Sequence, residues 1–464
     1  MKQTEFSVAM TESMDDSLNR FLLSDMESEE ICFGVWYPAK GKTRFSALIH
    51  EIVFPTDQDR KKDGHVEAFP EYVDRVKELA RERRGGVVMI HTHPFGRGPQ
   101  GVSQPDLHYE QDILSREIFG ITGLPLVGMT LAGDGTWSAR LYPEPFKIKW
   151  CDKVRIVGKN LTIHYNDNSQ KPTPNGRQIR TTSVWGEKKQ ADLMGLTVGV
   201  IGAGSVGSEV SQILAKLGVG KIILMDYDKI KIHNLDRMPA SDSDIGKYKI
   251  NVLKNILKKY TTNEKFVCST SKASVVEKTG YEIALDCDVV FSCVDRPYPR
   301  QVLNHLSYSC LIPVIDGGVS FQLKEGKLIH GVYRTQTVGP GRACLNCLKA
   351  YDPSEVQQDR DGLYDDPDYI KEFEKKTKTK TRQNIVPFVA SLAGHETIQF
   401  VELVTNLGNV GDFGRQQYDY YSGEIMPEMK SCTSGCEYVG YTALGDTKFP
   451  FLSADKSRLR EMKN

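Results

Sequence analysis

The stretch LTVGVIGAGSVG, residues 196–207, decides the fold of the larger part of this chain. Residues 196–201 are a continuous apolar run typical of a buried strand, and the glycine turn after it leads into an expected helix over 208–217. A second apolar run, 221–225, predicts the next strand. Strand, turn, helix and strand within about thirty residues form a βαβ unit, which predicts a parallel sheet with helices on both faces.

Other periodic segments extend this α/β pattern along the chain. The same sheet is expected to gain strands at 289–292 and 313–315, and residues 387–405 predict a long amphipathic helix. Residues 352–383 are charged and poor in apolar groups, so we expect a mobile loop there. The N-terminal part predicts a strand hairpin, a helix and three further strands: 29–37 with 45–53, then 68–84, then 87–90, 120–131 and 137–141.

The chain is long enough for more than one domain. Its 464 residues are too many for one hydrophobic core. The stretch HYNDNSQKPTPNG, 164–176, is rich in Asn, Pro, Gly and Ser, which indicates a linker. We expect a first domain over 1–160, a linker over 161–176 and a second domain over 177–464.

The composition excludes several classes of partner. Lys plus Arg equal Asp plus Glu, at 60 each, so no overall field attracts nucleic acid or an anionic membrane. We find no secretory signal and no run approaching the roughly 18 uncharged apolar residues of a membrane span. Ten cysteines, mostly isolated in apolar surroundings, favour a reducing compartment. We therefore expect a cytoplasmic protein that binds neither nucleic acid nor membrane.

Two histidines, His91 and His93, follow an apolar strand near the N-terminus. Side chains at i and i+2 of an extended segment point the same way, so both imidazoles can hold one zinc ion. Asp106 can complete a three-ligand site with a fourth position open to water, as a catalytic zinc requires. Zinc lowers the pKa of such a water toward about 7 and polarises a scissile carbonyl, while a glutamate must take and return the proton.

A series of charged residues follows the glycine turn of Gly202, Gly204 and Gly207. Asp226, about twenty residues on, stands where a ribose is normally bound, and this much fits a dehydrogenase equally well. The series continues with Asp228, Asn234, Arg237, Lys249 and Asp295. A hydride-transferring enzyme needs no such run of cations facing phosphate, so these residues favour phosphate chemistry.

The N-terminal motif, His-x-His-Pro followed by Ser-x-x-Asp, resembles that of the JAB/MPN (JAMM) metallopeptidases, which cleave ubiquitin-like proteins from their targets. The resemblance covers about residues 20–145 and implies a JAB/MPN α/β fold. It implies His91, His93 and Asp106 as zinc ligands and Ser103 as the residue that stabilises the oxyanion. A degenerate copy without activity is the alternative.

The resemblance also implies a catalytic glutamate near the end of an early strand. Glu30 in Glu30-Ile-Cys-Phe33 fits best, with Phe33 where the family often has glycine. Glu29 and Glu51 are the weaker alternatives.

The later series, D-x-D, N-L-x-R, G-x-x-K and a final Asp, resembles the adenylating domain of E1 enzymes and their ThiF/MoeB relatives, over about residues 175–440. The resemblance implies a Rossmann-like, doubly wound domain that uses ATP and Mg²⁺ to adenylate the C-terminus of a ubiquitin-like protein. It assigns Asp226 to the ribose, Arg237 and Lys249 to the triphosphate, Asn234 to phosphate and Asp295 to magnesium. Arg177, in an R-Q motif before the first strand, would reach the partner's site, which implies a homodimer.

Four cysteines form two close pairs, Cys344 with Cys347 and Cys432 with Cys436. The first pair has zinc-knuckle spacing and the second is one residue longer, so together they predict a tetrahedral structural zinc. ThiF-like proteins carry such a zinc. Two unrelated buried or redox-active pairs are the alternative.

E1 enzymes that pass the activated protein on as a thioester place a cysteine in the crossover loop, and no cysteine lies between Cys347 and Cys432. Thr379 or Thr381 lies nearest the expected place. Three interpretations stay open: direct transfer of the adenylate to a second protein, an oxyester on such a hydroxyl, or a zinc-site cysteine such as Cys436 as nucleophile. We favour direct transfer, because a hydroxyl without a base is a poor nucleophile at neutral pH.

The sequence thus predicts a bifunctional enzyme. An N-terminal zinc isopeptidase would mature or remove a ubiquitin-like modifier, and a C-terminal domain would adenylate that modifier, with an E2-like carrier as a further partner. The alternatives are sulfur-carrier activation for cofactor biosynthesis, a binding scaffold with inert sites and, most weakly, a nicotinamide oxidoreductase.

Overall fold

The computed structural model describes residues 4–63, 65–144, 146–166, 172–325, 327–366 and 384–454. Contacts along the chain divide it into two compact units. The first contains residues 1–170, 309–311 and 441–449, and the second contains 171–308, 312–440 and 450–464.

The first unit is built on a nine-stranded mixed sheet of order β11-β10-β1-β3-β2-β6-β7-β8-β9. Its strands are β1 (Glu5–Thr11), β2 (Ile31–Lys40), β3 (Arg44–Val53), β6 (Gly86–His93), β7 (Leu126–Ala132), β8 (Trp137–Tyr142), β9 (Lys149–Trp150), β10 (Lys153–Val157) and β11 (Leu161–Tyr165). A separate hairpin pairs β4 (Arg60–Asp63) with β5 (His65–Ala68). The helices are α1 (Glu12–Leu22), α2 (Pro70–Arg83), α3 (Gln104–His108), a π-helical turn (Tyr109–Leu114) and α4 (Ser115–Thr122).

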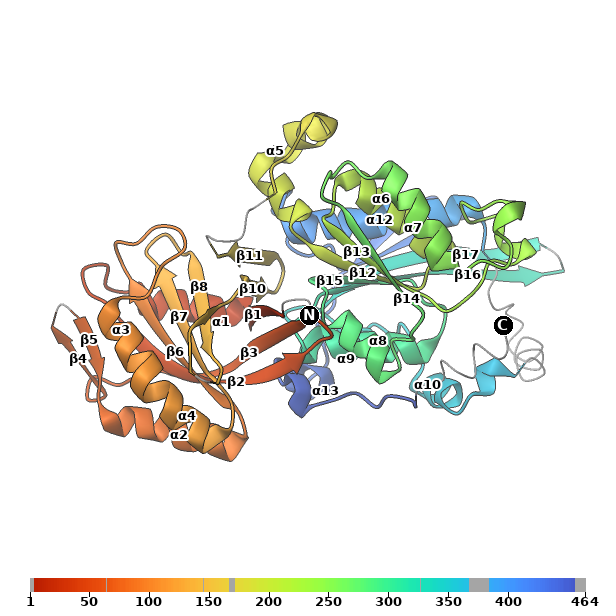
Figure 1. The fold of residues 1–464 in the computed structure, drawn as a ribbon. Helices are drawn as coiled ribbons and strands as arrows, with labels where there is room; N and C mark the ends of the chain where they lie inside the picture. Colours follow the sequence, from red (N-terminus) through yellow and green to blue (C-terminus); the bar gives the residue numbers. More distant parts are fainter. Residues whose placement is uncertain are drawn as a thin grey trace. The chain divides into compact units, whose positions relative to one another are not determined.

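Helices cover both faces of this sheet (Figure 1). One buried cluster joins α1, through Leu18 and Leu22, to one face. A second joins α2 and α4, through Tyr72 and Ile118, to the other face. Successive residues of β6 enter the two clusters in turn, because neighbouring side chains of a strand point to opposite faces. This alternation directs His91 to the face that α2 and α4 cover.

The second unit contains an eight-stranded sheet of order β14-β13-β12-β15-β16-β17-β18-β19. Its strands are β12 (Thr197–Ile201), β13 (Lys221–Met225), β14 (Val267–Ser271), β15 (Val289–Ser292), β16 (Val314–Lys324), β17 (Lys327–Val338), β18 (Arg415–Asp419) and β19 (Ile425–Glu428). Its helices are α5 (Ile179–Met194), α6 (Ser205–Leu217), α7 (Lys249–Tyr260), α8 (Lys278–Ala284), α9 (Pro297–Ser309), α10 (Pro353–Arg360), α12 (Val386–Thr405) and α13 (Glu437–Gly440). Within this unit, α6, α7 and α12 lie on one face of the sheet and α8 and α9 on the other (Figure 1).

The order of the parallel strands reverses between β12 and β15. From β12 the chain moves outward through β13 to β14, and then returns to add β15 and β16 on the other side of β12. In open α/β sheets, ligands bind at the carboxyl ends of the strands at such a switch point. Gly202 follows β12 there with φ +95°, and a Cβ on it would lie 2.4 Å from the carbonyl oxygen of Cys293, which follows β15. Only glycine permits this close approach.

Several predicted elements differ from the observed ones. The predicted strands at 221–225 and 289–292 are confirmed as β13 and β15. Residues 120–122, predicted as strand, belong to α4, which Gly123 ends at φ +68°, so β7 begins only at Leu126.

Two segments predicted as irregular contain regular structure. Residues 353–360, expected in a mobile loop, form α10, because Asp352 caps the helix by accepting from the Ser354 amide and Pro353 starts its first turn. Residues 161–165, assigned to the linker, form β11, which pairs antiparallel with β10. The cap of α10 and the strand pairing of β11 outweigh the polar composition on which the two predictions rested.

Candidate functional site

In the first unit the structure brings together His91, His93 and Asp106. Their candidate ligand atoms all lie within 4.8 Å of one another, and Nε2 of His91 is 3.8 Å from Oδ2 of Asp106. Both histidines belong to β6, which continues through them rather than ending at residue 90 as predicted. Asp106 lies in the first turn of α3. Strand and helix together thus supply two imidazoles and one carboxylate, a donor set that zinc binds.

His91 is prepared to act as a neutral ligand. It is 2% exposed, and burial, reinforced by the charge of Arg140, lowers its pKa to about 4. Its buried Nδ1 has no hydrogen-bond partner among the described residues. Burial keeps this imidazole in the neutral form that binds metal ions, so the residues present fit a bound metal ion.

A buried polar network contacts His91 at its Nε2. Thr130 Oγ1 lies 3.4 Å from His91 Nε2 and accepts from Nη1 of Arg140 at 2.9 Å. Arg140 forms a two-bond ion pair with Glu110, and Tyr142 donates to Glu110 at 2.6 Å. Glu110, Arg140 and Tyr142 are fully buried, so the network fixes the surroundings of His91 in β6.

Sequence reasoning missed this network, although one signal for it exists. Arg140 interrupts the apolar strand Trp137–Tyr142 at an inward position, and a charge there requires a buried partner. Glu110 gives a weaker signal, because it lies in a π-helical turn that no sequence pattern predicted. Such turns are frequently found at functional sites.

The predicted oxyanion residue, Ser103, is the N-cap of α3. Its hydroxyl donates to Oδ2 of Asp106 at 2.5 Å and accepts from the Asp106 amide at 3.2 Å. Ser103 therefore orients the candidate aspartate ligand in this structure, and its role toward an oxyanion stays a prediction.

The predicted base, Glu30, immediately precedes β2 and is 3% exposed. Its backbone pairs with Thr92, the residue between the two histidines: Thr92 N donates to Glu30 O at 3.0 Å, and Glu30 N donates to Thr92 Oγ1 at 2.9 Å. Its carboxylate is bound by Arg60 and Lys62 of β4, which the sequence had not indicated. Of the alternatives, Glu51 lies in β3 and contacts Arg83 at 3.9 Å.

In the second unit the glycine turn lies at the switch point, and α6 begins after it. The N-cap is Gly204, which provides no side-chain cap, and open space surrounds its Cβ position. The first amides of α6 are therefore available to an anion such as a phosphate. Gly207 packs so closely that a Cβ would lie 1.9 Å from the carbonyl oxygen of Gly202.

The predicted ribose ligand, Asp226, follows β13 and braces this turn. Its Oδ2 accepts from the Ala203 amide at 2.8 Å, and its Oδ1 accepts from the Asp228 amide at 2.7 Å. Burial, with the neighbouring charge of Asp228, raises the pKa of Asp226 to about 6, although Lys249 opposes the rise. Lys249 donates to Asp228 Oδ2 at 2.8 Å from the start of α7.

Of the other predicted nucleotide residues, Asn234 ends a short 3-10 turn, and Arg237 and Asp295 lie in loops. Asn234 is buried and closes a turn by accepting from the Lys231 amide at 2.9 Å. Arg237 contacts Asp236 at 3.1 Å, and Asp295 is exposed after β15. Burial alone would lower the pKa of Lys249, but Asp226, Asp228 and Asp295 raise it, so these charges lie within electrostatic reach of one another.

The four cysteines predicted to bind zinc also gather in the second unit. The sulfur atoms of Cys344, Cys347, Cys432 and Cys436 all lie within 4.8 Å of one another. Backbone amides donate to them, as Cys344 N does to Cys432 Sγ at 3.2 Å and Thr433 N to Cys347 Sγ at 3.4 Å. A hydrogen bond from Cys344 lowers the pKa of Cys432 to about 5. This cluster is consistent with a structural zinc site.

Arg177 and Thr379 are the other residues predicted to be catalytic. Arg177 is exposed in a short 3-10 turn, where its amide donates to Asn175 Oδ1 at 2.9 Å. Thr379 and Thr381 lie outside the described residues. Cys436, the alternative nucleophile, is 3.7 Å from the sulfur of Cys344 as a member of the four-cysteine cluster. Among the described residues, no helix is long and apolar enough to cross a membrane.

The switch-point turn and the cysteine cluster coincide with a match to a known family. The ThiF family model matches residues 175–436. This chain belongs to the ThiF family. Its second unit is therefore an E1-like adenylyltransferase domain, and the family implies that it binds ATP.

Curated relatives support the same assignment. An adenylyltransferase and sulfurtransferase of the MOCS3 type from Caenorhabditis briggsae is 30% identical over 192 residues, covering 40% of this chain and 46% of the relative. A UBA4-type enzyme of the same description from Scheffersomyces stipitis is 28% identical over 180 residues, covering 39% of each chain. A ubiquitin-like modifier-activating enzyme 5 from Aedes aegypti is 29% identical over 162 residues, covering 32% of this chain and 39% of the relative. The match thus spans less than half the length of each relative.

Solved structures provide a further comparison. A crystal structure of E. coli MccB covers 57% of this chain and 75% of its own, with 22% sequence identity and a TM-score of 0.47.

Proposed function

We propose that this ThiF-family protein activates a ubiquitin-like protein by adenylation and that its first unit is a JAMM-type metallopeptidase that cleaves the same protein from its targets. The observation that carries the adenylation half is the glycine turn at the β12–β15 switch point, with Asp226 and Lys249 beside it. The cluster of His91, His93 and Asp106 carries the peptidase half.

In the adenylation step, a C-terminal carboxylate oxygen attacks the α-phosphorus of ATP and pyrophosphate leaves. The amides at the start of α6 hold phosphate, and Asp226 accepts from the ribose hydroxyls. Lys249, released from Asp228, and Arg237 offset the negative charge that spreads over the phosphate oxygens. Asp295 is the proposed ligand of Mg²⁺.

In the hydrolytic step, water adds to the isopeptide carbonyl, and a carboxylate and a lysine amine result. His91, His93 and Asp106 would hold a zinc ion, which supplies a Lewis acid that polarises the carbonyl and acidifies a water. Glu30 takes the proton of the water and returns it to the leaving amine. Ser103 keeps Asp106 oriented.

Affinity purification from the native host with ATP present tests both halves together. Asp106→Ala is compared with wild type and with the matched control Asp112→Ala, an exposed carboxylate of the neighbouring turn that pairs with His108. We expect a small protein joined through its C-terminus to lysines, accumulating only in Asp106→Ala and absent from the Asp106→Ala/Lys249→Ala double variant. The absence of such adducts from wild type and from Asp106→Ala alike would contradict the proposal.

A second candidate function is activation of a sulfur carrier. The relatives described as adenylyltransferase and sulfurtransferase favour it, at 28–30% identity. This function predicts a thiocarboxylate at the partner's C-terminus and no lysine conjugates in Asp106→Ala. Intact mass spectrometry of the partner distinguishes the two outcomes. Conjugation to lysines additionally requires an E2-like carrier. We also expect a homodimer, in which Arg177 reaches the nucleotide site of the partner.

A further inference from the structure

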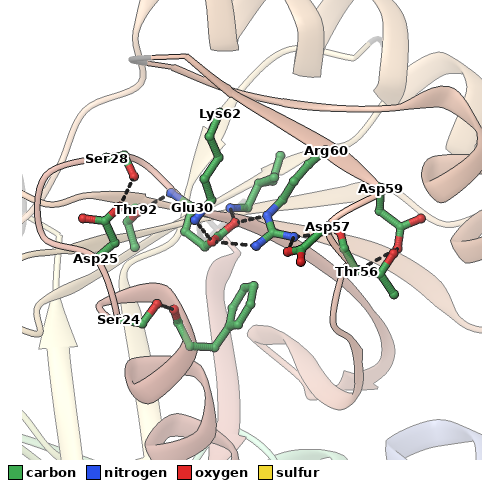
Figure 2. Close-up of polar contacts among 12 residues, drawn as sticks. Ser24, Asp25, Ser28, Glu30, Thr56, Asp57, Asp59, Arg60, Lys62 and Thr92 are labelled. Atoms are coloured by element: carbon green, nitrogen blue, oxygen red, sulfur yellow. Dashed lines mark hydrogen bonds and ion pairs between the residues drawn. The ribbon is translucent and has the colours of Figure 1, made fainter.

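The carboxylate of Glu30 is enclosed by cations of the β4–β5 hairpin (Figure 2). Arg60 Nε donates to Oε1 at 2.5 Å and Arg60 Nη2 donates to Oε2 at 3.0 Å. Lys62 Nζ contacts Oε2, and the amide of Ile31 donates to Oε1 at 3.1 Å. Figure 2 shows Arg60 and Lys62 pointing toward Glu30 from one strand.

Together these four donors occupy every hydrogen-bond acceptor site of the Glu30 carboxylate. A carboxylate has two oxygens with about four lone-pair sites. Each Glu30 oxygen already accepts two donors, and only 4% of the side chain is exposed. A general base must lie within hydrogen-bond reach of the proton that it removes. Glu30 therefore has no acceptor site left for a reacting water while Arg60 and Lys62 stay in place.

The cations are positioned by the hairpin and not by Glu30 alone. Arg60 and Lys62 are alternate residues of β4, so they share one face. Arg60 also donates to Thr56 O at 2.8 Å and lies 5.7 Å from the centre of the Phe21 ring. The base of the hairpin is anchored at Asp59, which accepts from Arg75 at 2.8 Å. The two cations would therefore remain on the hairpin if Glu30 turned away.

The two ends of Glu30 are thus held by different elements. Its backbone pairs with Thr92 of the metal-binding strand, while its carboxylate is bound to β4. We infer that Arg60 and Lys62 form a clamp that withholds the proposed base in the resting protein, and that movement of the β4–β5 hairpin on substrate binding releases it. The inference rests on the proposed peptidase function. It concerns the regulation of that function, namely the step at which Glu30 becomes available as a base.

Zero-length cross-linking measures the clamp without measuring activity. A carbodiimide joins a carboxylate to a lysine amine only when the two are in contact, with loss of water. We expect a Glu30–Lys62 linked peptide pair by mass spectrometry in the full-length wild type, and none in Lys62→Gln. We also expect its yield to fall in Asp106→Ala purified with bound conjugate, relative to the same variant without conjugate. An unchanged yield on conjugate binding would overturn the clamp, because a static structural pair behaves in that way.

Cleavage of the conjugates recovered from Asp106→Ala gives the second measurement. The Arg60→Gln/Lys62→Gln double variant should cleave them about tenfold faster than wild type, the change expected when hydrogen bonds to a charged group no longer oppose its release. Lys61→Gln, which removes one positive charge from the residue of β4 between them, is the control and should cleave at the wild-type rate. Arg60→Lys, which retains the charge, should lie between wild type and the double variant.

The outcomes separate the clamp from the function on which it depends. If wild type does not cleave the conjugates, the proposed peptidase function fails, and the clamp with it. If wild type cleaves them and the double variant is equally fast or slower, the function stands and the clamp is overturned, since the cations would then orient Glu30 productively.

Discussion

Oε1 of Gln100 lies 3.2 Å from Nδ1 of His93. The amide nitrogen of Gln100 donates to the carbonyl oxygens of Arg97 at 3.1 Å and Gly98 at 2.9 Å, so the oxygen must face the ring. His93 Nδ1 is then the protonated nitrogen, and the lone pair of Nε2 is free for a metal ion. Ligating histidines generally depend on such a partner for their tautomer and ring orientation.

Gln100→Ala should weaken zinc binding at the histidine site by about tenfold to a hundredfold, because the tautomer and orientation of His93 are no longer fixed. Competition with a chromophoric chelator measures this in the full-length chain, under conditions in which the four-cysteine site stays loaded. Gln104→Ala, an exposed glutamine at the start of α3, is the matched control. Equal affinities for the two variants would remove Gln100 from the site.

Glu110→Gln should destabilise the first unit locally by about 3–5 kcal/mol, because Arg140 would remain buried without its charged partner. Hydrogen–deuterium exchange of the β7 and β8 amides in the full-length protein gives the free energy of local opening. The control is Glu78→Gln, which removes an exposed partner of Arg81. That variant should leave exchange in β7 and β8 unchanged, since exposed ion pairs contribute little.

The sequence predicts best where one short signal determines the local structure. The apolar run and glycine turn of 196–207 predict β12, α6 and their connection, because a close approach such as that of Gly202 to Cys293 admits no other residue type. The His-x-His spacing likewise places two imidazoles on one face of β6. Long-range partners leave no such signal. Nothing near Glu30 indicates Arg60, thirty residues away, or Glu110 beneath Arg140.

Composition is a weaker guide to irregular segments. The charged stretch after Asp352 includes α10. In that helix the carboxylate of Asp359 accepts hydrogen bonds from Nη1 of Arg296 at 3.1 Å and from the Tyr298 amide at 3.2 Å. A charged helix can therefore be held by specific ion pairs rather than by an apolar face. Average hydropathy does not register such contacts.

Cys344→Ser should remove one zinc ion per chain from the second unit and leave the histidine site loaded. Loss of a structural zinc lowers stability because its binding energy contributes to folding, and we expect the unfolding midpoint to fall by roughly 5–10 °C. Metal analysis and differential scanning fluorimetry of the full chain measure both effects. Cys268→Ser, a buried cysteine of β14 outside the cluster, should retain the zinc. Unchanged zinc content in Cys344→Ser would favour unrelated cysteine pairs.

Binding of adenosine should weaken as the pH falls from 7 to 5. Burial raises the pKa of Asp226 to about 6, above its ordinary value of 3.8, so the carboxylate proposed to accept from ribose gains a proton as the pH falls through this range. A loss of about tenfold in affinity is expected if only the ionised form binds. Adenosine is the probe because it has no phosphate that titrates. Asp226→Asn should bind more weakly at pH 7 and show no change down to pH 5.

The same raised pKa has a stability consequence of defined sign. Between about pH 4 and 6 the folded chain binds this proton more tightly than the unfolded chain does. The contribution of Asp226 to folding stability therefore falls as the pH rises through that range. The charge of Lys249, which opposes the rise in this pKa, offsets part of the resulting negative charge at neutral pH.

Lys249→Ala should lower the rate of partner-dependent ATP–pyrophosphate exchange by about a hundredfold or more, because a positioned cation stabilises the charge that develops on the phosphate oxygens. Without nucleotide, the ammonium of Lys249 is bound to Asp228 at 2.8 Å. Binding to ATP would therefore require Lys249 to exchange the Asp228 carboxylate for a phosphate. Asp228→Asn should consequently tighten ATP binding while lowering catalysis less than Lys249→Ala does. Lys247→Ala is the matched control, because Lys247 lies two residues before Lys249, is exposed and pairs with Asp244 at 2.9 Å. A similar loss of exchange in both lysine variants would mean that general surface charge, and not the placement of Lys249 on α7, supports the reaction.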